Sequence, residues 1–260
     1  MSTGGSVKSF CFFVFLSLVM AASRKYLCAQ EIRPTQTPAP NFNSIYLVLG
    51  DSYAAGSGTD SQGTPFWQLT DNALNVWYPT ITWDHLTLSG CGPENWIDVL
   101  PQFFSDYKKK GLPVGYILFQ VGPNCFFIPN SPDCPDCCEG ATPSQAVSYS
   151  YAYKKCMSKA IGEIYAANPG VKLVVDTIPD PYNGTGKFTP TSFYQEYRKR
   201  LYELRPKYPQ MRIADLFTVM YGHPEYFKPT ADPRHPNDLG QKIVARAILE
   251  KFANWPYGPN

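Results

Sequence analysis

Short runs of consecutive apolar residues recur along the chain between residues 45 and 214. The clearest run, residues 45–49, ends at Gly50. A short, continuously apolar run that stops at a turn residue is typical of a strand buried on both faces of a parallel sheet. The pattern therefore predicts about five strands. The other four runs lie at residues 85–88, 116–121, 173–176 and 211–214.

Segments with helical spacing of apolar residues separate these runs. Residues 144–167 have apolar side chains at a helical period and are followed by Asn-Pro-Gly at 168–170, a sequence that ends helices. Because strands and helices alternate, we predict an α/β protein, a three-layer α/β/α sandwich with a central, mostly parallel sheet. Asn237 or Asp238 is the predicted N-cap of the last helix. Three further helices are predicted at residues 97–109, 192–205 and 239–252.

The first 43 residues have a different pattern from the rest of the chain. Lys8 precedes an apolar run at residues 10–20 and small residues at 21–23, the order found in a secretory signal peptide. A retained signal anchor is the alternative, but the run is too short to span a bilayer comfortably. We therefore expect a secreted, extracellular protein without a stable membrane anchor. The predicted organisation is a signal peptide at 1–29 with cleavage near 23–29, a Pro- and Thr-rich leader at 30–43, and a single domain at 44–260.

Composition and charge narrow the class of partner. The chain has 260 residues, is 44% hydrophobic and has a formal net charge of +2, with 23 Lys and Arg residues. A chain of this size can bury one substantial core. Its basic residues are dispersed rather than gathered in a block, which argues against a nucleic-acid partner. We expect a monomer with no nucleic acid bound.

The cysteines also suit a secreted protein. Of eight cysteines, cleavage after residue 29 leaves six, and an even number favours disulfides in an oxidising compartment. Half of a zinc site at residues 134–138 is the alternative, but no histidine or second cysteine pair lies at ligand spacing. The sequon at Asn183 predicts glycosylation. The disulfide candidates, whose connectivity stays open, are Cys91, Cys125, Cys134, Cys137, Cys138 and Cys156.

Ser52 directly follows the first predicted strand. A serine at this position is held at the carboxyl edge of the sheet, and we expect it to begin a helix whose first N–H groups point toward an oxyanion. Gly50 permits the sharp exit from the strand, and Gly56 and Gly58 let the backbone pass close to its neighbours. A simple helix cap at Asp51 or Ser52 is the alternative interpretation.

A carboxylate and a histidine lie three residues apart near the C-terminus. They belong to the Pro-rich sequence Asp232-Pro-Arg-His235, which we expect to form a loop before the last helix. A short turn brings the Asp232 carboxylate to Nδ1 of His235 and leaves Nε2 to take a proton from a serine. An accidental surface pair is the alternative. His85 falls within a predicted strand, and His223, without a carboxylate at comparable spacing, is the fallback base.

Four segments resemble the sequence blocks of the SGNH, or GDSL-type, hydrolases, in the order of that family. Residues 50–58 (Gly-Asp-Ser-Tyr-Ala-Ala-Gly-Ser-Gly) resemble the first block and residues 232–236 (Asp-Pro-Arg-His-Pro) resemble the last. Residues 88–90 and 121–124 resemble the two intermediate blocks. The resemblance spans residues 44–252 and implies an SGNH-type, flavodoxin-like sandwich. It also implies a catalytic triad, formed by Ser52, Asp232 and His235.

The resemblance further implies an oxyanion hole made by the N–H groups of Ser52 and Gly90 and by the side-chain amide of Asn124. It implies neither a metal nor a cofactor. Many relatives have aspartate after this asparagine, where this chain has Cys125. Our hypothesis is that a disulfide from Cys125 within the loop 125–138 positions Asn124 instead.

The implied activity is hydrolysis of a carboxylic ester through an acyl-enzyme on Ser52, as in secreted esterases and lipases. An O-acetylated polysaccharide is the alternative substrate. A non-catalytic binding or effector-like protein with the same fold is the alternative from another class, motivated by the altered third block. The expected partners are small-molecule, lipid or polysaccharide esters. Four tryptophans can stack on sugar rings, although aromatic clusters more often build cores: Trp67, Trp77, Trp83 and Trp96.

Overall fold

A five-stranded parallel sheet forms the centre of the molecule in the computed structural model. The strand order is β2-β1-β3-β4-β5, the order of flavodoxin-like folds. The sheet confirms the five predicted strands. They are β1 (Ile45–Gly50), β2 (Thr82–Thr87), β3 (Val114–Gln120), β4 (Lys172–Asp176) and β5 (Arg212–Ala214). The structure describes residues 44–60, 63–111, 113–124, 146–181, 191–228 and 232–253.

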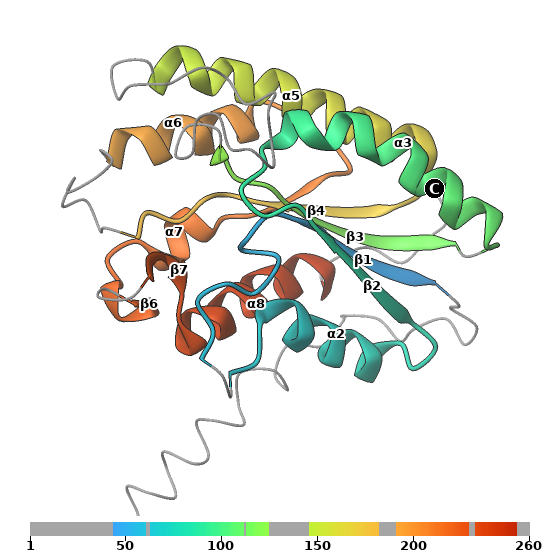
Figure 1. The fold of residues 1–260 in the computed structure, drawn as a ribbon, viewed down its shortest axis with the longest axis horizontal. Coiled ribbons are helices and arrows are strands. Elements are labelled where there is room, and N and C mark those ends of the chain that lie inside the picture. The colour runs from blue at the N-terminus through green and yellow to red at the C-terminus, as the bar shows by residue number, and fades with distance from the viewer. Residues whose placement is uncertain are drawn as a thin grey trace, which may run out of the picture.

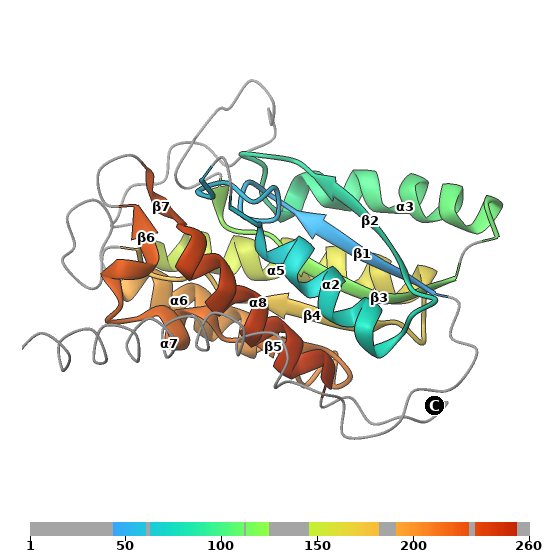
Figure 2. The same cartoon turned by 90° about the horizontal axis from the view of Figure 1, so that it is seen from below.

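Helices cover both faces of the sheet (Figure 1). One face packs against α3 (Pro93–Lys109), α5 (Ala146–Ala167) and α6 (Thr191–Tyr202). The other packs against α2 (Phe66–Trp77) and α8 (Asp238–Ala253), which Figure 2 shows in front of the sheet. The predicted α/β/α sandwich is therefore confirmed. No helix in the described ranges is long and apolar enough to cross a membrane.

Strand β1 shows why the strands were visible in the sequence. Leu47 and Leu49 belong to the core beneath α3 and α5, while Tyr46 and Val48 belong to the core beneath α2 and α8. All residues of β1 are buried. Because both faces of the sheet are covered, the strand is apolar throughout instead of alternating with polar residues.

Local capping chemistry sets two helix starts. Helix α3 begins four residues before the predicted start, because Pro93 suits the first helical position and the N–H of Gly92 donates to Oδ1 of Asn95 at 3.1 Å. Helix α8 begins at Asp238. Its N-cap is Asn237, whose Oδ1 accepts the N–H groups of two residues in the first turn at 3.0 Å each.

Helix α2 was not predicted, and it buries two polar residues. Thr70 and Asp71 are buried, and Pro65 provides no side-chain cap that would mark the start of the helix. The Oγ1 of Thr70 shares a hydrogen bond with the Tyr46 hydroxyl at 3.0 Å, and Asp71 accepts from Asn75 at 3.0 Å. These bonds satisfy groups that would otherwise be costly to bury.

The predicted loop around His235 is wrong, because residues 232–236 form a strand. This strand, β7 (Asp232–Pro236), pairs antiparallel with β6 (Phe227–Lys228) after a short 3₁₀ turn η2 (Pro224–Tyr226). A two-stranded sheet leaves one edge of each strand unpaired, so prolines, which lack an N–H, are tolerated there. A further short helix, α7 (Leu216–Met220), precedes the turn.

The predictions for the N-terminal segments lie outside the described residues. They concern the signal peptide at 1–29 and the leader at 30–43. The sequon at Asn183 also lies outside the described residues. All three stay predictions.

Candidate active site

Ser52 and His235 meet although 183 residues separate them. The Nε2 atom of His235 lies 2.8 Å from Oγ of Ser52. Ser52 follows β1 and His235 lies in β7, and both residues are half-buried. At this distance an imidazole can accept the serine proton, the arrangement that activates a serine as a nucleophile.

The Ser52 loop, residues 51–58, consists of turns and not of the predicted helix. Within it the N–H of Ser57 donates to the carbonyl of Ser52 at 3.0 Å. Gly56 and Gly58 have φ angles of 78° and 93°, which interrupt a right-handed helix. The prediction of a helix N-terminus at Ser52 is therefore wrong.

The close backbone approach predicted at Gly58 is present, and a second one lies at Gly50. A Cβ on Gly58 would lie 2.4 Å from the carbonyl oxygen of Pro236 and 2.7 Å from Cβ of His235. A Cβ on Gly50 would lie 2.2 Å from the carbonyl oxygen of Gln120. Glycine at these positions lets the Ser52 loop pack directly against β7 and β3.

Asp51 holds the Ser52 loop to the turn after β3. Its Oδ2 accepts from the N–H of Gly122 at 2.8 Å and from Nδ2 of Asn124 at 2.7 Å, and its Oδ1 accepts from the N–H of Tyr53 at 2.9 Å. Burial raises the pKa of the Asp51 carboxyl, although these hydrogen bonds and the nearby His235 oppose the rise. The interpretation of Asp51 as a helix cap missed this bracing role.

The side-chain amide of Asn124 connects the ends of three neighbouring strands. Its Nδ2 donates to Asp51 and, at 3.0 Å, to the carbonyl of Cys91, so the protein itself occupies both amide hydrogens. Gly90, one residue before Cys91, has a φ of 79° in the turn after β2. Ser52, Gly90 and Asn124 thus lie in adjoining turns at the carboxyl ends of β1, β2 and β3.

Comparison with known proteins places this arrangement in a familiar fold. No protein-family model matches the sequence. No curated protein matches it either. Solved structures do match: a lipase from a goat rumen metagenome is 16% identical with a TM-score of 0.65, covering 81% of this chain and 98% of that chain. The chain has the SGNH hydrolase fold.

Two further structures share this SGNH fold. An acetylxylan esterase from Geobacillus stearothermophilus is 16% identical with a TM-score of 0.57, covering 85% of this chain and 96% of the other. A member of the lipolytic protein G-D-S-L family from Veillonella parvula is 13% identical with a TM-score of 0.55, covering 80% and 97%.

Asp232, the predicted triad acid, is the first residue of β7 and pairs in register with Lys228. Its side chain lies outside the described residues, so its contact with Nδ1 of His235 stays a prediction. Tyr53 also contacts the histidine strand. Its ring lies 5.2 Å from the His235 ring, and its hydroxyl donates to the carbonyl of Arg234.

The other two histidines have partners of their own. His85 lies in β2, as predicted, and its Nε2 hydrogen-bonds with the carbonyl of Ala54 at 2.7 Å. The Nδ1 of His223 lies 2.8 Å from Oε1 of Glu225, so a carboxylate does accompany His223, at a spacing of two residues and not three. The turn at Pro224 brings the two side chains together, and both are exposed at the surface.

The cysteine predictions are tested in only a small part of the chain. Cys91 is buried just before α3, and Cys156 is half-buried on α5. The residues of the predicted Cys125 loop lie outside the described residues, so that loop and the three disulfides stay predictions. In the described part of the chain, no group of three His, Cys, Asp or Glu residues is placed to hold a metal. Four of the six disulfide candidates lie outside it: Cys125, Cys134, Cys137 and Cys138.

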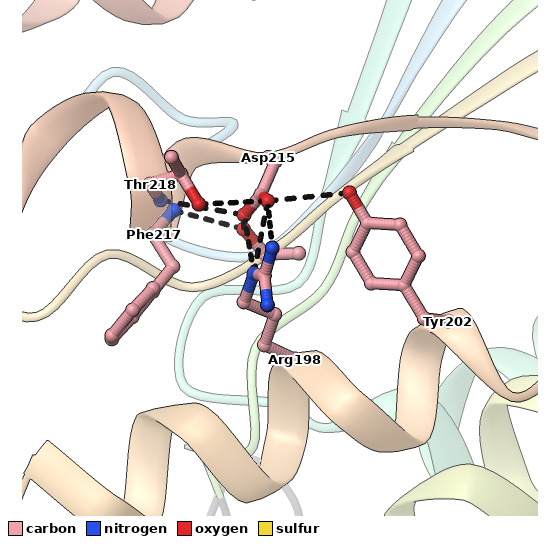
Figure 3. A network of polar contacts seen from close by, with 6 residues as sticks. Arg198, Tyr202, Asp215, Phe217 and Thr218 are labelled. Carbon is pink, nitrogen blue, oxygen red and sulfur yellow. Dashed lines mark hydrogen bonds and ion pairs between the residues drawn. The ribbon is translucent and has the colours of Figure 1, made fainter.

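A second polar network lies beyond the carboxyl ends of β4 and β5 (Figure 3). Oδ2 of Asp215 accepts from Nη2 of Arg198 at 2.6 Å, from Oγ1 of Thr218 at 2.8 Å and from the hydroxyl of Tyr202 at 3.2 Å. Burial opposes ionisation of Asp215, but the hydrogen bonds from Arg198 and Thr218 outweigh it and lower its pKa. Thr177 donates to Oδ1 at 3.1 Å. These bonds join α6 and α7 to the sheet.

Proposed function

We propose that this chain is an SGNH-type serine hydrolase that cleaves carboxylic esters. The 2.8 Å contact between Nε2 of His235 and Oγ of Ser52 carries the proposal. The contact lies at the carboxyl edge of a parallel sheet, where folds of this class bind their ligands. Lipases and esterases with the same fold support it.

The proposed reaction proceeds through an acyl-enzyme. Oγ of Ser52 attacks the ester carbonyl carbon while Nε2 of His235 takes the serine proton, and the carbonyl electron pair moves to oxygen. When the tetrahedral intermediate collapses, the bond to the alcohol breaks and His235 returns the proton to the leaving oxygen. Water, deprotonated by the same imidazole, then releases the acid. Asp232 is the proposed partner of Nδ1.

The oxyanion is proposed to bind the N–H groups of Ser52 and Gly90 and one N–H of Asn124. In this step the oxyanion replaces the Cys91 carbonyl, whose bond at 3.0 Å is the longer of the two that Asn124 makes. Asp51 keeps the other amide hydrogen and so maintains the orientation of the side chain. Each donor of this kind stabilises the transition state by a few kcal/mol, on the order of 3.

Replacement of the nucleophile tests the proposal. Ser52→Ala removes Oγ and is expected to lower the turnover of nitrophenyl acetate by at least about 10³-fold while the protein remains folded by circular dichroism. Ser105→Ala, which changes an exposed serine on α3, is the matched control and should keep full turnover. Turnover by Ser52→Ala at the rate of the control would contradict the proposal.

A short-chain or lipid carboxylic ester is the leading substrate, and an O-acetylated polysaccharide is the second candidate. An aromatic stack favours the latter, because the Trp67 ring lies 4.8 Å from the rings of both Trp83 and His85, and Trp83 is 44% exposed. Trp77 and Trp96 are buried and belong to the core. A panel of short-chain esters, long-chain lipids and acetylated xylan separates the two candidates. Loss of activity on xylan alone in Trp83→Ala would identify the polysaccharide.

We also propose that the protein is secreted as a monomer after removal of residues 1–29. The order of charged, apolar and small residues in that segment supports this proposal. N-terminal sequencing of protein collected from the culture medium tests it, with a mature N-terminus near residue 30 as the expected result. Protein found only in the membrane fraction with its N-terminus intact would contradict it.

A further inference from the structure

The side chain of Gln241 ties the Ser52 loop to strand β7. Gln241 lies near the start of α8 and is fully buried. Its Nε2 donates to the carbonyl oxygens of Ser57 and Pro236, at 3.1 Å each, and its Oε1 accepts from the N–H of Phe66 at 2.9 Å. One amide thus uses both of its donor hydrogens and its acceptor on three separate backbone segments.

Each of the two donated hydrogen bonds leads to the backbone of one residue of the reacting pair. Pro236 directly follows His235. The N–H of Ser57, whose carbonyl binds Gln241, donates to the carbonyl of Ser52 at 3.0 Å. The same buried amide is therefore linked to His235 through the adjacent Pro236, and to Ser52 through the hydrogen bond that Ser57 donates.

Two other hydrogen bonds near these segments lie at the surface. The Tyr53 hydroxyl donates to the carbonyl of Arg234, and the N–H of Asp60 donates to Asp238 at 2.9 Å, but both contacts are exposed. Water can replace such bonds when they are lost. The bond from Gln241 to the Pro236 carbonyl is buried and the bond to the Ser57 carbonyl is partly buried, so water replaces the amide less readily there, and we expect its loss to loosen the contact between the segments.

We infer that Gln241 is a positioning residue for the Ser52–His235 pair. It acts through the backbone on either side of the pair and does not touch the reacting atoms. A misplacement of about 1 Å at a reacting centre can lower a rate by 10²-fold. The kinetic part of this inference rests on the proposed function, whereas its structural part does not.

Gln241→Met tests the inference with a side chain of similar size that cannot donate a hydrogen bond. We expect kcat for nitrophenyl acetate to fall by roughly 10- to 100-fold while KM stays within about twofold. Tyr208→Phe is the control, because it removes a buried hydroxyl that donates to the Ser158 carbonyl at 2.6 Å, far from Ser52 in the other core. It should keep wild-type kcat.

Gln241→Glu separates the acceptor of the amide from its donors. A carboxylate still accepts from the N–H of Phe66 but places an oxygen against the carbonyls of Ser57 and Pro236. We expect kcat to fall at least as far as in Gln241→Met. Wild-type kcat in either folded variant would overturn the inference.

A nitrogen NMR spectrum of histidine-labelled protein makes the test independent of turnover. The chain has three histidines, and His235→Gln identifies the signal of His235. That signal is expected to shift in Gln241→Met, as its bond to Ser52 weakens, and to stay in place in Tyr208→Phe. If wild-type protein hydrolyses no ester, the proposed function fails, and an unchanged His235 signal in Gln241→Met still overturns the positioning role.

The wild-type protein provides a last measurement in case neither variant folds. The Nε2 hydrogens of Gln241 should exchange with solvent more slowly than those of the exposed Gln102. Equally rapid exchange in the two side chains would overturn the inference.

Discussion

Asp51 and Asp215 both follow strands at the same edge of the sheet, but their surroundings are opposite. The donors that the described residues supply to Asp51 are uncharged, and burial raises its pKa. Asp215 binds the guanidinium of Arg198, and its pKa is lowered (Figure 3). The carboxyl beside the reacting pair is thus held by neutral groups, whereas the carboxyl that anchors a helix is neutralised by a cation.

This difference suits the position of Asp51 beside the reacting pair and the structural position of Asp215. A cation bound to Asp51 would disfavour the positive imidazolium that His235 forms when it takes the serine proton. Neutral donors let Asp51 orient Asn124 without placing a positive charge near that imidazolium. Asp215 lies outside the proposed reacting pair, so its bidentate bond to Arg198 can stabilise the fold without affecting the imidazolium.

Of the variants that test this difference, Asp51→Asn should have the largest effect, which is a loss of kcat. An amide at this position cannot accept hydrogen bonds with both of its terminal atoms, so either Tyr53 or the pair formed by Gly122 and Asn124 loses its acceptor. We expect kcat to fall about 100-fold through misplacement of the Asn124 amide. Steady-state kinetics and a thermal melt on the same sample measure this. A kcat within threefold of wild type would show that Asp51 only stabilises the loop.

Asp215→Ala should have the opposite profile. It leaves the Arg198 guanidinium without its partner, and we expect the free energy of unfolding to fall by about 2 kcal/mol, less than for a fully buried pair because Arg198 is partly exposed. Because Asp215 is not part of the proposed reacting pair, kcat should stay within about twofold. Urea unfolding and ester kinetics measure the two quantities.

The control for Asp215 is Asp106→Ala, which removes an exposed pair with Lys109 on α3. It should leave the urea midpoint unchanged. A large loss of kcat in Asp215→Ala, at unchanged stability, would show that the second network takes part in catalysis and would contradict the purely structural role of Asp215.

Substitution of Asp71, a third buried carboxyl, should have a smaller effect, which is a pH-dependent change in the free energy of unfolding. Burial raises the pKa of Asp71 to about 6, against the hydrogen bond from Asn75. Because the folded state holds this proton more tightly than the unfolded chain, the stabilisation is present below about pH 4 and is lost as the pH rises through 6. Asp71→Asn should therefore exceed wild type in unfolding free energy by about 1 to 2 kcal/mol at pH 7 and match it at pH 4. Urea unfolding at both pH values measures this, and equal stability at pH 7 would contradict it.

The inner strands β1, β3 and β4 were predictable from sequence because they are largely buried, whereas the first half of the edge strand β2 is exposed and its predicted start was three residues late. Helix α2 was not predicted, and no side-chain N-cap marks its start at Pro65. Strand β7 was missed because its prolines favour loops except in an edge or two-stranded pairing. Buried apolar strands are thus predictable from the sequence, whereas a helix without a side-chain cap and a strand that contains prolines are harder to predict.

The residues of the site also fall into those that the sequence predicted and those that it did not. Ser52 and His235 belong to motifs whose order along the chain points to them, and the structure brings them together. Asp51 and Gln241 bind backbone groups across the fold, and such contacts follow from tertiary packing alone. The pairing of His223 with Glu225 was missed because a two-residue spacing suits a tight turn and not the triad pattern.

Labelling with a fluorophosphonate probe tests most directly whether Ser52 is activated by His235. The probe reacts with an activated serine, and peptide mapping by mass spectrometry locates the adduct. We predict a single adduct on Ser52 and a labelling rate at least about 100-fold lower in His235→Ala. A protein that stays unlabelled, or one labelled equally fast without His235, would contradict the account and leave a non-catalytic protein with this fold.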